Sequence, residues 1–189
     1  MKMFLSLLFI AIVAIVIVAT SGIYNISAVE KHWNITEKAL AWMRNSSIDA
    51  HAKNLAVPPL SEEEVLSSGL AHYHAMCVDC HLYPDQKQTE ISMGLYPQAP
   101  IFHERTPVTE PSQQSEIMKK YFWVIKNGIK MTAMPAWGLS HDDKSIWAMA
   151  ALTLKLHGMS TQEYEKHIHA LEADDAHDHD DHDNHSHSH

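Results

Sequence analysis

Residues 77–81 read Cys-Val-Asp-Cys-His, a C-x-x-C-H stretch that contains both cysteines of the 189-residue chain. Two thiols at this spacing can each form a thioether with one vinyl group of a porphyrin, and the adjacent imidazole then lies beneath the metal. The spacing is the attachment signature of haem c. It predicts Cys77 and Cys80 as covalent haem attachments and His81 as the proximal iron ligand, and it leaves no cysteine for a disulfide framework elsewhere.

Three other interpretations of the cysteine pair compete with haem attachment. A thioredoxin-like dithiol needs a βαβ context, which the sequence pattern lacks. A zinc site needs a second pair of cysteines or histidines at tight spacing, and none stands out. A structural disulfide across so short a loop is uncommon. Because the motif follows a predicted helix in an exported chain, we favour haem attachment.

A second axial ligand is sought among ten methionines. A methionine opposite a histidine raises the reduction potential of a haem. Met131 and Met134 lie in a predicted loop, in the run GIKMTAMPAWG (128–138). A loop methionine followed by a rigid proline is well placed to point its sulfur inward, which favours Met134 and leaves Met131 as the alternative. Three isolated histidines are weaker candidates for the same position: His72, His74 and His103.

The residues around the motif predict helices joined by loops. Ser61 and Glu64 form a capping-box pattern after a proline linker, and Asn127-Gly128 is a helix stop signal. The predicted segments are a helix from Ser61 into Cys77, a proline-rich loop over 82–111, a helix from 112 or 113 to 127, a loop over 131–139, a helix over 140–156 capped by Ser140, and a short amphipathic helix over 161–171.

The order helix, CVDCH, proline loop, helix, MPAWG, helix resembles class I cytochromes c. It is most similar to the membrane-anchored monohaem subunits of cbb3-type oxidases and alcohol dehydrogenases. The resemblance covers about residues 61–164 and implies an all-α fold around one covalent haem c. It implies that the methionine before Pro-Ala, Met134, is the axial ligand, and that a proline carbonyl, which we assign to Pro100, orients His81.

The same family pairs a glycine and an aromatic residue of the first helix with an aromatic residue of the last. Gly69, Tyr73 and Trp147 match these positions. Tyr73 and Trp137 are also expected among the cofactor-binding residues. The family pattern does not extend to the N-terminal 60 residues or to the histidine-rich end of the chain.

The N-terminal region predicts a membrane anchor over residues 1–24. Residues 4–19 form an apolar run interrupted only by Ser6, and outward counting gives roughly 20 residues, enough for a helix to cross a bilayer. A cleaved signal peptide is the alternative. Either way the remainder is exported. Lys2 on the inner side agrees with a haem domain in the periplasm of a bacterial inner membrane.

Residues 25–60 are expected to form a juxtamembrane helix and a linker. Trp33 and Trp42 suggest a partly amphipathic helix within 25–53, either at the membrane interface or packed on the globular domain.

Residues 172–189 are rich in histidine and aspartate, a composition that cannot build a packed core, and we expect a disordered tail. Imidazole and carboxylate together suit zinc, copper or nickel. The alternative is a solvated acidic tail that meets metals incidentally. The candidate ligands of the tail are His177, His179, His182, His185, His187 and His189.

The expected function is outer-sphere electron transfer. A net charge of −9 argues against a nucleic-acid partner. The sequence offers no general base or activated nucleophile beside the motif, so we expect a carrier or an electron-transfer subunit that serves an oxidase, a dehydrogenase or a quinol-oxidising complex. A metal-handling or sensory haem protein that uses the tail is the second hypothesis, and a haem enzyme with an open sixth position is the third.

Overall fold

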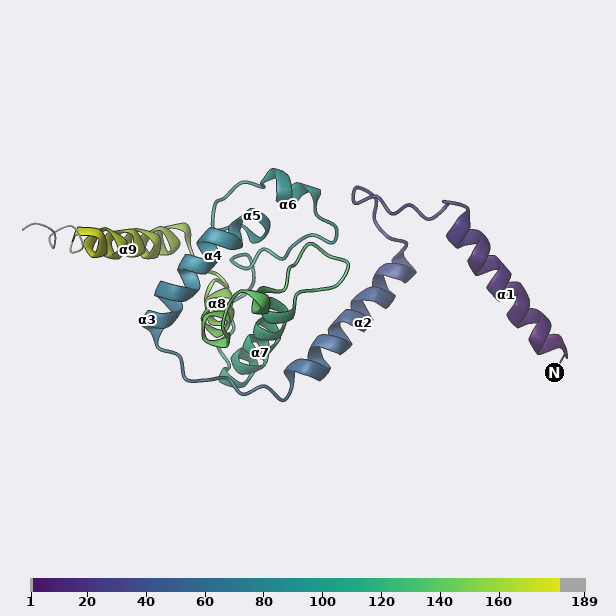
Figure 1. The fold of residues 1–189 in the computed structure, drawn as a ribbon, viewed down its shortest axis with the longest axis horizontal. Coiled ribbons are helices and arrows are strands. Elements are labelled where there is room, and N and C mark those ends of the chain that lie inside the picture. Colours follow the sequence, from purple (N-terminus) through teal and green to yellow (C-terminus); the bar gives the residue numbers. More distant parts are fainter. Residues whose placement is uncertain (1, 181–189) are drawn as a thin grey trace, which may run out of the picture. The chain divides into compact units, whose positions relative to one another are not determined.

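The computed structural model describes residues 2–180 of the chain, and their side chains as far as residue 173. Every regular element in this range is helical, as the sequence predicted (Figure 1). The chain divides into two compact units, Met1–Ala41 and Trp42–His189. The division falls inside helix α2 (Asn34–Ala52).

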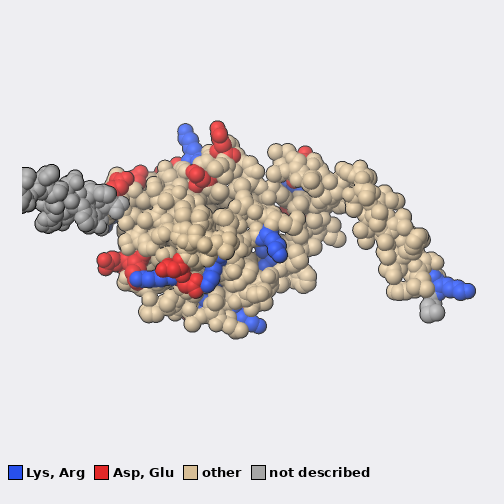
Figure 2. Space-filling model, viewed as in Figure 1, with Lys and Arg blue, Asp and Glu red and all other residues tan. Residues whose placement is uncertain are grey.

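The first unit contains helix α1 (Lys2–Thr20), which is formed by the predicted apolar run. None of its residues is buried, and it is long and apolar enough to cross a membrane. Figure 2 shows an uncharged surface along α1 after the lysine at its start. The segment after α1 is held together by Tyr24, whose hydroxyl lies 2.7 Å from His32 Nδ1 and whose ring meets Trp33 edge to face.

The second unit is built around helix α8 (Asp143–Lys155), whose residues 146–153 are all buried. A helix that is buried on every side is a core helix, and its neighbours supply the amphipathic faces. α8 packs on α7 (Pro111–Asn127) and on a continuous helical stretch formed by α3 (Glu62–Glu64), η1 (Val65–Gly69) and α4 (Leu70–Met76). The remaining elements are α5 (Val78–His81), α6 (Glu90–Gly94), η2 (Trp137–Leu139) and α9 (Thr161–Asp180).

The stretch before the motif and α8 touch through their backbones at Gly69. A Cβ atom on Gly69 would lie 2.6 Å from the carbonyl oxygen of Ala148. The predicted contact of this glycine with the last core helix is therefore seen. The aromatic part of the predicted pairing differs, because Trp147 stacks on Phe122 (centroids 4.0 Å apart) while Tyr73 lies in a separate buried cluster.

The cap of α8 corrects the sequence analysis. The side chain of Asp142, not Ser140, accepts the hydrogen bond from the backbone N–H of Ser145 (2.8 Å), and the helix begins at Asp143. Ser140 closes the preceding 3₁₀ turn η2, because its backbone N–H donates to the carbonyl of Trp137. An aspartate and a serine are equally good caps in isolation, so the turn decides between them.

Other boundaries also shifted. α7 begins at Pro111, where proline is favoured in the first turn. The predicted loop over 82–111 contains α6, which is capped by Thr89. α9 continues to Asp180, so helix extends into the region for which we predicted disorder.

The predicted capping box at Ser61 is confirmed, and it gives a pH-dependent contribution to stability. Glu64 bonds the backbone N–H of Ser61 and pairs with Lys144 (2.8 Å). The Lys144 hydrogen bond, followed by those of Ser61, lowers the pKa of Glu64 from 4.5 to about 2. Because the folded-state pKa is depressed, the stabilisation is complete above pH 4.5 and is lost as the pH falls toward 2.

Replacement Glu64→Gln is therefore expected to flatten the acid dependence of stability in that pH window. The thermal midpoint of the wild-type chain should fall more steeply with acidification than that of the variant. Glu63→Gln, on the same turn, is the matched control and should keep the wild-type slope. Equal slopes for Glu64→Gln and wild type would contradict the prediction.

Candidate functional site

The C-x-x-C-H motif forms one helical turn, in which Cys77 follows α4 and the other four residues make up α5. The backbone N–H groups of Cys80 and His81 both donate to the carbonyl of Cys77, at 3.1 and 2.8 Å. This turn gathers two thiols and an imidazole at one end of the first core helix. Both cysteines are free and half-buried. The structure thus brings the three predicted motif residues together.

The electrostatics of the thiols argue against a dithiol redox centre. Burial, and then the neighbouring Cys80, raise the pKa of Cys77 to about 12. Burial and Asp79 also raise the pKa of Cys80. Reactive dithiols instead have lowered thiol pKa values. Within the described residues, no group of three or more histidine, cysteine, aspartate or glutamate side chains could hold a metal ion, so the zinc interpretation gains no support there.

His81 is oriented by the loop that follows it. Its Nδ1 lies 2.9 Å from the carbonyl oxygen of Pro100. A carbonyl only accepts, so Nδ1 carries the proton and Nε2 keeps its lone pair. Phe102 stacks on the imidazole with centroids 4.8 Å apart. Burial lowers the pKa of His81, which favours the neutral ring that binds metals.

Two buried tyrosines, Tyr73 and Tyr164, contact the residues that flank the motif. The hydroxyl of Tyr73 donates to the carbonyl of Leu82, directly after the motif (2.7 Å). Tyr164 of α9 is buried, stacks flat on Tyr83 (5.3 Å) and places its hydroxyl 3.0 Å from His74 Nδ1. α9 therefore covers this side of the motif.

The methionine loop distinguishes the two candidate ligands. Met131 is 95% exposed, whereas Met134 is half-buried. The backbone of Met134 is fixed on both sides, because its N–H donates to Thr132 Oγ1 (3.1 Å) and its carbonyl accepts from Ile129 (3.2 Å). Trp137 follows at the start of η2 and meets His141 edge to face. Of the two candidates, Met134 is therefore the less exposed and the one whose backbone is held by hydrogen bonds.

A family model described as "Cytochrome C oxidase, cbb3-type, subunit III" matches residues 64–152. The matched segment begins at the capping box, includes the motif and the methionine loop, and ends in α8. Residues 64–152 form a class I cytochrome c domain. No match was found among curated proteins or among solved structures. The resemblance stated from the sequence is confirmed, and the domain is one that binds haem c.

The residues of this cytochrome c domain fit that cofactor. Two free thiols and a neutral imidazole share one turn, and the imidazole nitrogen that could bind iron is not used by the Pro100 hydrogen bond. A hydrogen bond that fixes the tautomer of a histidine in this way also orients it as a metal ligand.

A polar network behind Phe102 was missed by the sequence analysis. Arg105 lies over the Phe102 ring (5.3 Å) and donates to the hydroxyl of Tyr121 (2.8 Å), which lies 2.8 Å from His157 Nε2. Burial, and then the charge of Arg105, lower the pKa of His157. The partners are 16 and 36 residues apart in the chain, so no local spacing could reveal them. The only indication in the sequence was that Phe102 follows two residues after Pro100, the residue assigned to orient His81.

The remaining predicted histidines either contact other residues or lie outside the described side chains, and the His72 ring meets His141 edge to face (5.1 Å). His72 bonds the Ser68 carbonyl through Nδ1 (2.6 Å), and the Nδ1 atom of His103 is buried without a partner. His177 and His179 lie in α9 beyond the described side chains, and four tail histidines lie outside the described residues: His182, His185, His187 and His189.

Gly128 holds the methionine loop against the end of α7. Its φ is +66°, and a Cβ atom there would lie 2.8 Å from the Met134 carbonyl oxygen. Gly128→Ala would combine a left-handed backbone, which costs about 1–2 kcal/mol, with this clash. We expect the variant to displace Met134 and to lower the reduction potential of the cytochrome c domain, measured by redox titration. Lys130→Ala, exposed in the same loop, should leave the potential unchanged.

Proposed function

We propose that the chain is a membrane-anchored, monohaem c-type cytochrome that acts as an electron carrier or as the electron-transfer subunit of a respiratory or dehydrogenase complex. The observation that carries the proposal is the Pro100–His81 hydrogen bond beside two free thiols, within a segment that matches a cbb3-type subunit III. This set of groups suits covalent haem c.

In this proposal Cys77 and Cys80 would hold the haem through thioether bonds, and His81 and Met134 would bind its iron. Haem c supplies one-electron chemistry between ferrous and ferric iron. Pro100 and Phe102 keep the His81 ring in one orientation, and the bonds of the Met134 backbone restrict the second ligand. Tyr73 and Trp137 complete the proposed cofactor-binding residues. Ligands fixed in this way need little reorganisation during electron transfer.

The proposed location is a bacterial inner membrane with the haem domain in the periplasm. α1 is long and apolar enough to span, and Lys2 precedes its apolar run. Thioether attachment also agrees with an exported domain. The proposed partners are redox proteins: an oxidase, a dehydrogenase or a quinol-oxidising complex. The site proposed here offers ligands and contacts for a carrier, and we assign it no catalytic residue.

An optical spectrum of the purified chain, oxidised and reduced, tests the ligand assignment. The wild type should be low-spin with a methionine–iron charge-transfer band, and Met134→Ala should lose that band. Met131→Ala is the matched control, three residues away in the same loop, and should keep it. A high-spin spectrum, or one indifferent to Met134, would refute the ligation and favour a sensor or a haem enzyme with an open sixth position.

A second candidate function, metal handling by the tail, rests on six histidines among the last 13 residues. Imidazole with carboxylate suits zinc, copper or nickel. A chain truncated after residue 173 separates the two functions. A carrier keeps its electron-transfer rate after truncation, whereas a metal-handling protein loses zinc binding and its phenotype together.

A further inference from the structure

The part of α2 that belongs to the second unit leaves its largest apolar side chains in solvent. Trp42 is 73% exposed and Met43 is 59% exposed. Ser46 is exposed one turn later. These three residues form an uncharged surface, which we call the Trp42 face. By helical spacing, Ile35 and Ala39 extend this face toward the start of the helix.

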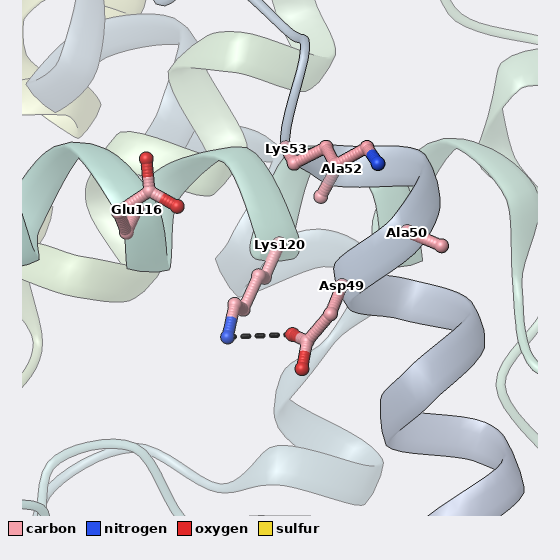
Figure 3. A pocket seen from close by; sticks show the side chains of 6 residues that line it. All are labelled: Asp49, Ala50, Ala52, Lys53, Glu116 and Lys120. Atoms are coloured by element: carbon pink, nitrogen blue, oxygen red, sulfur yellow. Dashed lines mark ion pairs between the residues drawn. The ribbon is translucent and has the colours of Figure 1, made fainter.

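The last turn of the same helix holds the cytochrome c domain. Ala52 is buried, and Asp49 pairs with Lys120 of α7 (2.6 Å; Figure 3). The His51 ring lies 5.3 Å from the Trp123 ring. These contacts all lie at the last turn of α2. A pocket of about 310 Å³ lies there between α2 and α7. α2 is therefore attached at its end and leaves the Trp42 face uncovered.

Such a helix needs a partner for its apolar face. Helices in proteins are stabilised mainly by the packing of that face and less by intrinsic propensity. Exposed tryptophan beside methionine is also unusual on a surface that only meets water. The question is what covers the Trp42 face.

The adjoining sequence identifies the occupant as lipid. α1 ends at Thr20 and α2 begins at Asn34, and the 13 residues between them reach at most about 45 Å. This connection itself exposes Ile23, Ile26 and Val29. Tryptophan is enriched at membrane–water boundaries, where a ring can be half in the apolar layer. Trp42, Met43 and Ser46 are themselves uncharged, with Lys38 one turn before Trp42 and Asp49 one turn after Ser46.

We propose that the Trp42 face of α2 lies in the headgroup layer of the membrane that α1 spans, so that α2 is a second, interfacial contact. The proposal rests on the proposed membrane anchor. It implies that the cytochrome c domain is held at the membrane surface through the Asp49–Lys120 and His51–Trp123 contacts. A domain held in this way serves redox partners that also lie at the membrane.

Photocrosslinking of the full haem-loaded chain tests the proposal. Benzoylphenylalanine is placed at position 42, at position 37 and at position 10, one variant at a time. Position 37 is exposed on α2 and lies five residues from Trp42, about 140° around the helix. The variants are reconstituted in vesicles of phosphatidylethanolamine and phosphatidylglycerol, and an unchanged haem spectrum reports their folding. Mass spectrometry then identifies the adducts.

We expect lipid adducts at positions 10 and 42, with the yield at 42 severalfold above that at 37. Adducts at position 10 with equal yields at 42 and 37 would overturn the interfacial contact alone. A product that joins two chains through position 42 would overturn it in favour of a second copy of the chain. Absence of lipid adducts at position 10 would overturn the membrane anchor itself.

Discussion

Gly69→Ala is expected to lower the free energy of unfolding of the cytochrome c domain by about 2–3 kcal/mol, a typical cost of overpacking in a core. The new Cβ atom would lie 2.6 Å from the Ala148 carbonyl oxygen and 3.2 Å from Leu152 Cβ. The first of these atoms is backbone, so no rotamer change relieves the contact. The variant must separate the stretch before the motif from α8, although alanine itself favours a helix.

Denaturant unfolding followed by haem absorbance and by circular dichroism measures the effect. Gly94→Ala is the matched control, because nothing lies within 4 Å of a Cβ atom at this position of α6. That variant is expected to be neutral or slightly stabilising, since alanine restricts the unfolded chain. Equal midpoints for Gly69→Ala and Gly94→Ala would show that the two helices separate without cost, contrary to the packing described above.

The sequence could predict the elements whose signals are local. The C-x-x-C-H spacing, the Ser61 capping box and the Gly128 stop each depend on residues within one or two turns, and the structure has each of these turns or helix ends. The helix order around them was enough to suggest the family that residues 64–152 match. Pro100 was named from the resemblance alone, and its carbonyl lies 2.9 Å from His81 Nδ1.

The sequence could not predict features that depend on tertiary contacts. Ser140 and Asp142 are equal caps until the η2 turn engages the backbone of Ser140. Trp147 could have met Tyr73 or Phe122, and only the position of α7 beside α8 selects Phe122. The link between Arg105, Tyr121 and His157 joins three separate segments for the same reason.

Replacing both motif cysteines, Cys77→Ser with Cys80→Ser, is expected to abolish covalent haem entirely. The chain has no other cysteine, so neither thioether can form elsewhere. The pKa values of both thiols are raised, whereas a dithiol redox centre needs lowered ones. Raised values agree with thiols that react once and then stay buried. Haem staining after denaturing electrophoresis gives the measurement.

Each single replacement tests one attachment by itself. It leaves one cysteine, whose thioether should still retain haem on the denatured chain. Asp79→Ala is the matched control inside the motif, since the Asp79 side chain is exposed and its backbone carbonyl still accepts from Thr89. That variant should stain like wild type. Haem that survives denaturation in the double variant would refute attachment at residues 77–81, and with it the carrier function. If haem is lost only in the double variant, either thiol alone can hold the cofactor beside His81.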